Sequence, residues 1–225
     1  MTYTRFAIYH LPSDTALAGF GARWLGWDVV RGKPAEPFDI PGLSQVVERP
    51  RKYGFHATMK PPFRLADGRT LDTLRAQVEA LATRIAPARA EGLKLTSLGR
   101  FLALTICGDT HEIDRVAAAC VTELDSFRAP ASEDELAKRR GKGLRPQQEE
   151  MLLRWGYPHV LQTFRFHMTL TGRVPKGDLP GWEERVRLHL PPLPAPFLLD
   201  TISLCGERPD GLFEEIERFP LTGQV

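Results

Sequence analysis

Residues 53–63 read Tyr-Gly-Phe-His-Ala-Thr-Met-Lys-Pro-Pro-Phe, and residues 164–172 read Phe-Arg-Phe-His-Met-Thr-Leu-Thr-Gly. Both stretches contain the order aromatic, His, apolar, Thr, apolar, so a His-x-Thr motif occurs twice. Successive side chains of a β-strand point to opposite faces, so each motif predicts a strand that buries one face and presents His beside Thr on the other. Two half-buried strands with structural histidines are the competing interpretation, because short motifs also arise by chance.

The sequence after each motif predicts the same series of elements. A helix and two strands are expected after the first motif, at 70–86, 93–98 and 101–107. The same series is expected after the second motif, at 180–189, 197–205 and 212–219. This repetition predicts an α+β fold built by internal duplication. We expect a single bilobed domain over residues 1–225 with a pseudo-twofold axis, antiparallel sheets lining a central cleft and helices on the outside.

The rest of the chain supplies further elements around the motifs. We expect a strand, a helix, a Gly/Pro-rich loop and a second helix at 5–11, 14–25, 32–50 and 110–127. The strand of the first motif, near residues 55–60, is expected to end at Pro61-Pro62. The strand of the second motif is expected near residues 166–171.

A polar helical insertion is predicted over about residues 128–158. Ser132 and Glu135 have the spacing of a capping box, which marks the start of a helix. A second short helix is expected over 147–155, with Pro146 in its first turn and Gly156 at its end. The basic run at 138–142 is expected to be solvated and mobile, and a lid over the cleft is the alternative.

The composition is that of an ordinary globular protein. The 225 residues include 30 basic and 28 acidic side chains, for a formal charge of +2, which gives no electrostatic argument for binding a nucleic-acid duplex. Three cysteines without a Cys-x-x-Cys pair predict neither a disulfide framework nor a thiolate metal site. No signal sequence and no apolar run of 18 residues occurs, so we expect a cytoplasmic protein without a membrane partner.

The polar faces of the two strands predict acid–base chemistry on a phosphate. The two-residue period places Lys60 beside His56 and Thr58, and it places Arg165 and Thr171 beside His167 and Thr169. Two imidazoles can supply a general base and a general acid near neutral pH. Hydroxyls and cations are the groups that bind phosphate oxygens. The motifs contain no carboxylate, and the chain has no Gly-x-Ser-x-Gly elbow, Walker loop, dinucleotide loop or metal-binding His/Cys cluster.

The two motifs and their surroundings, which include Trp155-Gly-Tyr-Pro158, resemble the two-histidine (2H) phosphoesterase superfamily, in the branch named for phosphonate metabolism. The resemblance implies a cyclic or 2',5'-linked phosphodiester substrate and no metal or other cofactor. It implies catalysis by His56 and His167, with Thr58 and Thr169 binding phosphate oxygens. By analogy His167 is the base and His56 the acid, and a phosphoribosyl cyclic phosphate is the candidate substrate.

The sequence therefore predicts a metal-independent phosphodiesterase that hydrolyses a small cyclic phosphodiester. Lys60, Arg165 and Thr171 are expected to help bind the phosphate, and Tyr53, Tyr157 and His10 are further candidates to line the cleft. Core packing for the two tyrosines and a structural role for His10 are the alternatives. The expected partner is a small phosphorylated metabolite or a nucleotide. The competing functions are an RNA 2',5'-ligase or RNA-end phosphodiesterase, and a non-catalytic module that binds a nucleotide or an RNA end.

Overall fold

A computed structural model describes residues 2–141 and 143–224 and has an α+β fold, as predicted. Its main sheet is antiparallel and has seven strands in the order β11-β10-β1-β4-β8-β7-β6. These strands are β1 (Phe6–His10), β4 (Ala57–Phe63), β6 (Gly92–Leu98), β7 (Phe101–Cys107), β8 (Met168–Thr169), β10 (Thr201–Glu207) and β11 (Phe213–Pro220). Two small sheets pair β2 (Trp27–Asp28) with β3 (Lys33–Pro34), and β5 (Ala88–Ala90) with β9 (Phe197–Leu199).

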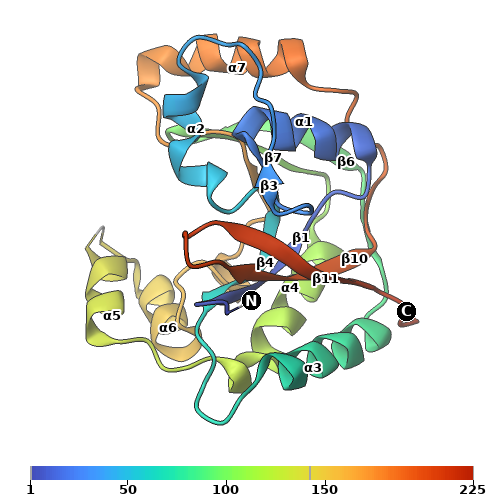
Figure 1. Ribbon diagram of the computed structural model, residues 1–225, viewed down its shortest axis with the longest axis vertical. Helices are drawn as coiled ribbons and strands as arrows, with labels where there is room; N and C mark the ends of the chain where they lie inside the picture. Colours follow the sequence, from blue (N-terminus) through green and yellow to red (C-terminus); the bar gives the residue numbers. More distant parts are fainter. Residues whose placement is uncertain (1, 142, 225) are drawn as a thin grey trace.

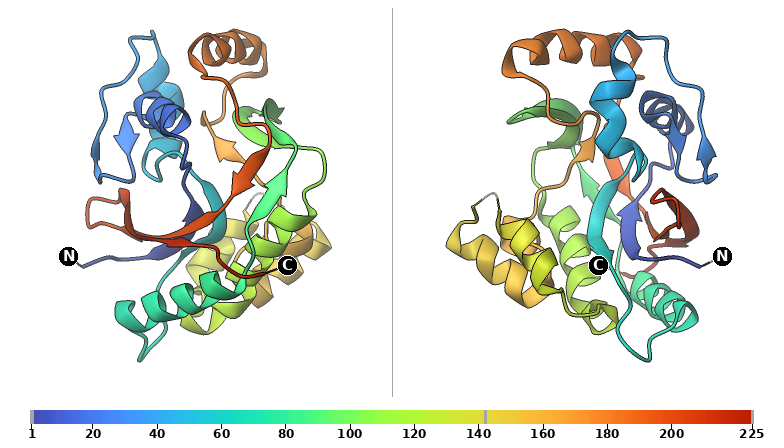
Figure 2. Two further views of the ribbon diagram at one scale, coloured as in Figure 1. Left: turned by 90° about the vertical axis from the view of Figure 1, so that its right-hand side faces the viewer. Right: turned by 60° about the vertical axis from the view of Figure 1, so that its left-hand side comes forward.

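The helices gather at the two ends of the molecule, with the main sheet between them (Figures 1 and 2). One group comprises α1 (Thr15–Leu25), α2 (Leu43–Arg51) and α7 (Leu179–His189). The other comprises α3 (Leu71–Arg84), α4 (His111–Glu123), α5 (Glu133–Arg140) and α6 (Pro146–Trp155). Short 3₁₀ turns lie at Asp125–Phe127, Leu161–Thr163 and Lys176–Asp178.

The predicted series of a helix and a hairpin after each motif is confirmed. Each hairpin joins the sheet on the side of the other motif's strand. The β6–β7 hairpin follows the first motif but pairs beside β8, which carries the second motif. The β10–β11 hairpin follows the second motif but pairs with β1, which lies beside the first motif strand, β4. The sheet is therefore built from the two halves of the chain crosswise, and this brings the two motif strands together at its middle.

The main core lies on one face of the sheet, where the apolar residues of both motifs are buried. Phe55, Ala57 and Met59 from the first motif are at most 2% exposed, and Phe166 and Met168 from the second are at most 3% exposed. They pack with apolar side chains of α1, α3, α4 and α7 in one continuous cluster. The alternation predicted for the two motif strands is thus observed between His and Thr on one face and apolar residues on the other.

The loop expected over 32–50 contains helix α2, which the sequence analysis missed. Gly42 starts this helix in the left-handed region at φ 82°, and Pro50 lies inside its last turn. Proline has no N–H and cannot bond to the carbonyl of the residue four positions earlier. That carbonyl, on Val46, instead accepts a 2.6 Å hydrogen bond from the Gly172 N–H, just beyond the second motif. A tertiary contact thus takes the place of the missing helical hydrogen bond.

The insertion is helical, as predicted. Ser132 and Glu135 form the expected capping box at the start of α5, and Gly156 ends α6 with φ 72°. Met151 of α6 is buried against Val121 of α4. Residues 138–140 of the basic run form the last turn of α5 and Gly141 is its C-cap, whereas Lys142 lies outside the described residues.

Candidate functional site

The two His-x-Thr motifs meet on neighbouring antiparallel strands. Ala57 of β4 lies directly opposite Met168 of β8. In an antiparallel pair with this register, His56 faces Thr169 across the strands and Thr58 faces His167, with side chains about 5 Å apart at their Cβ atoms. All four side chains lie on the sheet face opposite the main core and are partly exposed. The structure therefore brings the four central site residues predicted from the sequence into one crosswise group.

The backbone fixes the tautomer of His56. Its Nδ1 lies 2.9 Å from the Gly54 carbonyl oxygen, and its Nε2 lies 3.0 Å from Thr58 Oγ1. A carbonyl oxygen only accepts hydrogen bonds, so the proton sits on Nδ1 and the Thr58 hydroxyl donates to Nε2. Gly54 has φ 70°, and a Cβ atom there would come within 2.4 Å of the Val29 side chain. Glycine at this position thus lets the chain present its carbonyl to the imidazole.

His167 repeats this arrangement. Its Nδ1 lies 2.8 Å from the carbonyl oxygen of Arg165, two residues earlier, as Gly54 is two residues before His56. The same tautomer follows, so Nε2 is the unprotonated, basic nitrogen of both rings. The Phe101 ring lies 6.0 Å from the His167 ring and borders it on the β7 side.

Both imidazoles favour the neutral form. Burial lowers the pKa of His56 to about 4, the Gly54 carbonyl opposes this change, and His167 lowers the pKa further. Burial also lowers the pKa of His167, with a further lowering from the nearby Arg165 guanidinium. A proton on His167 therefore disfavours a proton on His56. A bound anion has the opposite effect and stabilises the protonated form.

Tyr9 of β1 belongs to the site, although the sequence analysis did not single it out. It pairs with Thr58, and its ring stacks on His56 with 3.8 Å between ring centroids and 29° between ring planes. Tyr9 is fully buried, and its hydroxyl has no hydrogen-bond partner among residues 2–141 and 143–224. No motif marks this residue, because its position depends on which strand pairs with the first motif.

Tyr53 and Tyr157 lie on the same side of the molecule as the histidines. The Tyr53 ring is 6.2 Å from the His56 ring, and Lys52 Nζ lies over it at 4.7 Å from its centroid. Burial raises the pKa of Tyr157, and Tyr53 contributes to that increase. The Arg139 guanidinium of the insertion stacks on Tyr157 at 4.8 Å. Both tyrosines therefore stay candidates for lining the site.

The expectation for Lys60 is wrong, because β4 contains a bulge. Tyr9 pairs with Thr58 but Ile8 pairs with Lys60, so β4 has one more residue than β1 at this point. The bulge turns Lys60 to the face opposite Thr58, where the side chain is 2% exposed. Its Nζ donates to the Val121 carbonyl near the end of α4 at 2.9 Å and lies 3.6 Å from Asp125. Lys60 therefore anchors a helix end and does not face the histidines.

Thr171 departs from the prediction for the same reason. The Leu102 carbonyl accepts hydrogen bonds from both the Leu170 and the Thr171 N–H, which marks a bulge in the strand after the second motif. Thr171 is 1% exposed, and its hydroxyl accepts from the Leu102 N–H at 3.0 Å and donates to the Gly172 carbonyl at 2.9 Å. Its side chain therefore bonds to the backbone of β7 and does not face the site.

His10 is not a lining residue either, whereas Arg165 lies beside the site. His10 pairs with Ala57 and shares its core-facing side, is 1% exposed and stands edge-on to Phe197. Arg165 is exposed, its carbonyl holds His167, and its guanidinium is close enough to lower the pKa of that ring. A role for Arg165 in binding phosphate stays a prediction.

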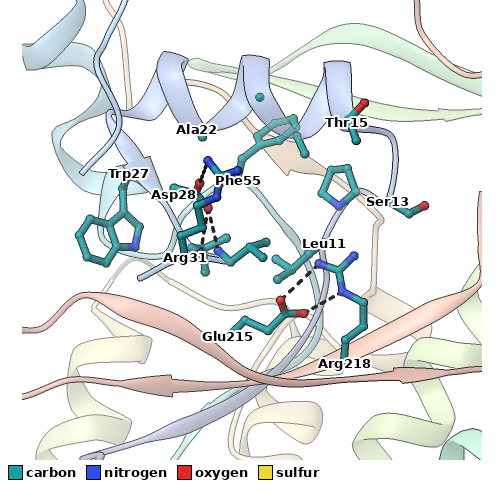
Figure 3. Close-up of a pocket in the computed structure, with 15 residues that line it drawn as sticks. Leu11, Ser13, Thr15, Ala22, Trp27, Asp28, Arg31, Phe55, Glu215 and Arg218 are labelled. Carbon is teal, nitrogen blue, oxygen red and sulfur yellow. Dashed lines mark hydrogen bonds and ion pairs between the residues drawn. The ribbon is translucent and has the colours of Figure 1, made fainter. Parts of the chain in front are cut away.

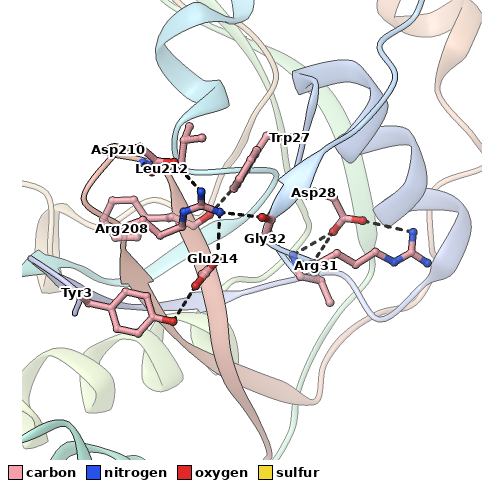
Figure 4. Close-up of polar contacts among 11 residues, drawn as sticks. Tyr3, Trp27, Asp28, Arg31, Gly32, Arg208, Asp210, Leu212 and Glu214 are labelled. Atoms are coloured by element: carbon pink, nitrogen blue, oxygen red, sulfur yellow. Dashed lines mark hydrogen bonds and ion pairs between the residues drawn. The ribbon is translucent and has the colours of Figure 1, made fainter. Parts of the chain in front are cut away.

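The loop beside His56 is held in place by a polar network. Arg208 donates to the Gly32 carbonyl at 2.8 Å and pairs with Glu214 at 3.4 Å, and the Tyr3 hydroxyl donates to Glu214 at 2.8 Å (Figure 4). These contacts tie the loop after β2 to strand β11. Because Val29 of this loop contacts Gly54, the network also supports the segment that positions His56.

One pocket near the site has charged walls that are already neutralised. It has a volume of about 410 Å³ and lies between α1, the loop after β2 and strand β11 (Figure 3). Asp28 pairs with Arg31 at 3.6 Å, and Glu215 pairs with Arg218 at 2.8 Å. Neither catalytic histidine candidate lines this pocket.

Two kinds of feature are absent from the described part of the chain. In residues 2–141 and 143–224, no group of three or more His, Cys, Asp and Glu side chains is arranged to hold a metal ion. None of the helices described is both long and apolar enough to span a membrane.

Fold and site together define an α+β protein in which two His-x-Thr motifs, one from each half of the chain, form a paired-histidine site on adjacent strands. Residues 58–214 match the family described as "Protein of unknown function (DUF1045)", and the chain belongs to this family. The resemblance to the two-histidine phosphoesterases, which was drawn from the motifs, agrees with this pairing.

Two curated relatives carry the same name. A protein of Janthinobacterium sp. (strain Marseille), "Ribose 1,5-bisphosphate phosphokinase PhnN", is 36% identical over 233 residues, which cover 98% of this chain and 51% of the relative. A protein of that name from Laribacter hongkongensis (strain HLHK9) is 31% identical over 193 residues, 82% of this chain and 44% of the relative. The chain thus spans about half the length of the curated relatives it matches.

Solved structures are similar at lower identity. TT0787 of Thermus thermophilus is 18% identical, with a TM-score of 0.47 over 98% of this chain and 100% of that one. E. coli LigT complexed with 3'-AMP is 13% identical, with a TM-score of 0.45 over 98% of this chain and 99% of that one.

Proposed function

We propose that the chain is a metal-independent phosphodiesterase that hydrolyses a small cyclic phosphodiester by paired-histidine acid–base catalysis. The observation that supports this proposal most strongly is that the two imidazole rings have the same tautomer and the same backbone hydrogen bond. His56 and His167 directly precede the adjacent strands β4 and β8, and each donates Nδ1–H to a carbonyl two residues earlier, which leaves Nε2 as the basic nitrogen. A phosphorus atom between two such nitrogens has a base on one side and an acid on the other, as an in-line displacement requires.

In the proposed mechanism, His56 is the base and His167 the acid. This reverses the assignment made by analogy: a general base has to be neutral, and of the two rings only His56 accepts a hydrogen bond from a Thr hydroxyl at Nε2, which requires this nitrogen to be unprotonated. The negative charge of a bound phosphodiester raises the pKa of His167 and lets that ring carry a proton. His56 takes a proton from water, the water oxygen bonds to phosphorus, and His167 protonates the departing sugar oxygen.

The two threonines bind the non-bridging oxygens in this proposal. Thr58 and Thr169 flank the histidines on the same face, and a hydroxyl can donate to a phosphate oxygen. The Thr58 hydroxyl donates to His56 Nε2, so it has to rotate toward the phosphate when substrate binds. That rotation also frees His56 Nε2 for the attacking water.

We propose a phosphoribosyl cyclic phosphate as the substrate. The relatives are named for a kinase that acts on ribose 1,5-bisphosphate, and about half of their length lies outside the match to this chain. If water attacks the phosphorus of a 5-phosphoribosyl 1,2-cyclic phosphate and the bond from phosphorus to the 2-oxygen breaks, the product is ribose 1,5-bisphosphate. The present chain contains no Walker loop, so we assign the kinase activity of the relatives to the half that it does not match.

Phosphorus NMR on a panel of cyclic phosphates tests this proposal. The panel contains 5-phosphoribosyl 1,2-cyclic phosphate and nucleoside 2',3'-cyclic phosphates, and each reaction is run with and without EDTA. We expect turnover that survives EDTA in the wild type and in the control His111→Ala, whose side chain is exposed at the start of α4. His56→Ala and His167→Ala should each lose at least about 100-fold in rate. Full activity in either variant would refute the mechanism, and binding without turnover would favour the non-catalytic alternative.

A further inference from the structure

A second cavity, of about 600 Å³, gathers positive charge, and neither His56 nor His167 lines it. It lies between α2, the turn from β6 to β7, the segment after β8 and the start of α7. Arg49, Arg100 and Arg173 line it, one from each of the first three segments. Among the ion pairs within 4.0 Å in residues 2–141 and 143–224, none involves these three guanidinium groups.

The amino-terminal end of α2 opens into the same cavity. Gly42 and Gln45 of its first turn line the cavity, and Gly42 supplies no side-chain cap to the helix. The first N–H groups of a helix have no partner within it, and the helix dipole makes this end attractive to anions. The Leu43 N–H already donates to the Ile40 carbonyl at 3.0 Å, so the amides that the α2 end adds to the three arginines are the following ones of its first turn.

The cavity is held together by tertiary hydrogen bonds. The Gly172 N–H donates to the Val46 carbonyl that Pro50 leaves free, which ties α2 to the segment after the second motif. Arg100 Nε donates to the Val174 carbonyl at 3.2 Å, which ties the β6–β7 turn to the same segment. The three arginines thus come from segments that are fixed to one another.

The other residues that line the cavity indicate the chemistry of its ligand. Glu48 and Asp178 also line the cavity, so the guanidinium groups outnumber the carboxylates by three to two. The ring of Trp182, which is 8% exposed, forms an apolar wall near Gly42. We propose that this cavity binds the phosphate group of a small phosphorylated metabolite, with the arginines and the α2 amides on the phosphate and Trp182 against the organic part.

Isothermal titration with inorganic pyrophosphate tests the site directly. We expect binding to the wild type and to the control Arg89→Gln, because Arg89 lies in β5 and does not line the cavity. Arg49→Gln and Arg173→Gln should each weaken binding about tenfold or more, as expected for the loss of a hydrogen bond to a charged group. Glu48→Gln should strengthen binding, because it removes a like charge from the wall. Absence of binding to the wild type, or equal binding by the Arg49→Gln/Arg173→Gln double variant, would overturn the proposal.

The same variants identify the source of the phosphate and separate this proposal from the proposed function. If the phosphate belongs to the substrate, Arg173→Gln raises KM for 5-phosphoribosyl 1,2-cyclic phosphate but not for a nucleoside 2',3'-cyclic phosphate, which has no second phosphate. If it belongs to a separate metabolite, pyrophosphate binding is lost and neither KM changes. Both results support the site. Pyrophosphate binding requires no turnover, so it stays measurable even if the chain shows no phosphodiesterase activity.

Discussion

The Tyr9 ring should control the pKa of His56. It covers one face of the imidazole at a centroid distance of 3.8 Å and keeps water from that face. The lowering from the ordinary 6.5 to about 4 corresponds to about 3 kcal/mol against the charged ring. If covering one of the two faces of the imidazole ring accounts for up to half of the lowering of its pKa, Tyr9→Leu should raise the pKa of His56 by about one unit.

Proton NMR of the His56 ring during a pH titration measures this shift without any assumption about substrate. Tyr9→Phe is the matched control, because it keeps the ring and removes only the hydroxyl, so His56 should titrate as in the wild type. His10, which is 1% exposed on the other side of the sheet and has a pKa lowered to about 4 by burial, reports on the fold in the same spectra. An unchanged His56 midpoint in Tyr9→Leu, with His10 also unchanged, would refute the reasoning.

The same substitution should move the pH–rate profile. A general base has to be neutral, so kcat/KM falls as the pH drops through the pKa of the base. The acid limb of Tyr9→Leu should therefore move up by the same amount as the NMR midpoint if His56 is the base. A limb that stays in place while the His56 midpoint moves would assign the base to another group.

Three further substitutions test the remaining contacts. The pKa of His10 is lower in the folded chain than its ordinary 6.5, so the unfolded chain binds more protons and stability is lost as the pH falls from 6.5 to about 4. His10→Asn should remove about 3 kcal/mol of this loss, as measured by urea unfolding across that pH range. Lys60→Met should cost about 1–3 kcal/mol, because the Val121 carbonyl loses its donor, and KM should not change; a raised KM without destabilisation would restore Lys60 to the phosphate site. Thr171→Val should cost a similar amount by leaving the Leu102 N–H unpaired, and Thr171→Ser should recover it; equal stability of the two variants would contradict the role of the hydroxyl.

The sequence predicted the elements whose signals are local. Caps and helix ends appeared where side chains of the right type occur, as with Ser132 and Glu135 at α5 and Gly156 after α6. The His-x-Thr pattern also located the starts of β4 and β8, which directly follow His56 and His167, because burial of alternate residues is a short-range pattern. These predictions needed no knowledge of which strands pair.

The missed features depend on contacts between distant segments. The Gly/Pro-rich composition of residues 32–50 predicts a loop where α2 occurs, and nothing local shows that Gly172 compensates for the helical bond that Pro50 removes. Tyr9 joins the site only because β1 pairs with β4 in one register. Such features follow from tertiary packing, which local propensity does not encode.

The misplacements of Lys60 and Thr171 share one cause, which also limits the residues that can face the site. The simple two-residue period fails after Thr58 and again after Thr169, because a bulge follows each motif. In each half the fourth residue after the His, Lys60 or Thr171, turns away and bonds to a main-chain group of another element. The internal duplication therefore extends to this irregularity. Because each bulge ends the alternation directly after the Thr, only the His and the Thr of each motif face the site, and the charge that a phosphate needs has to come from outside the two strands.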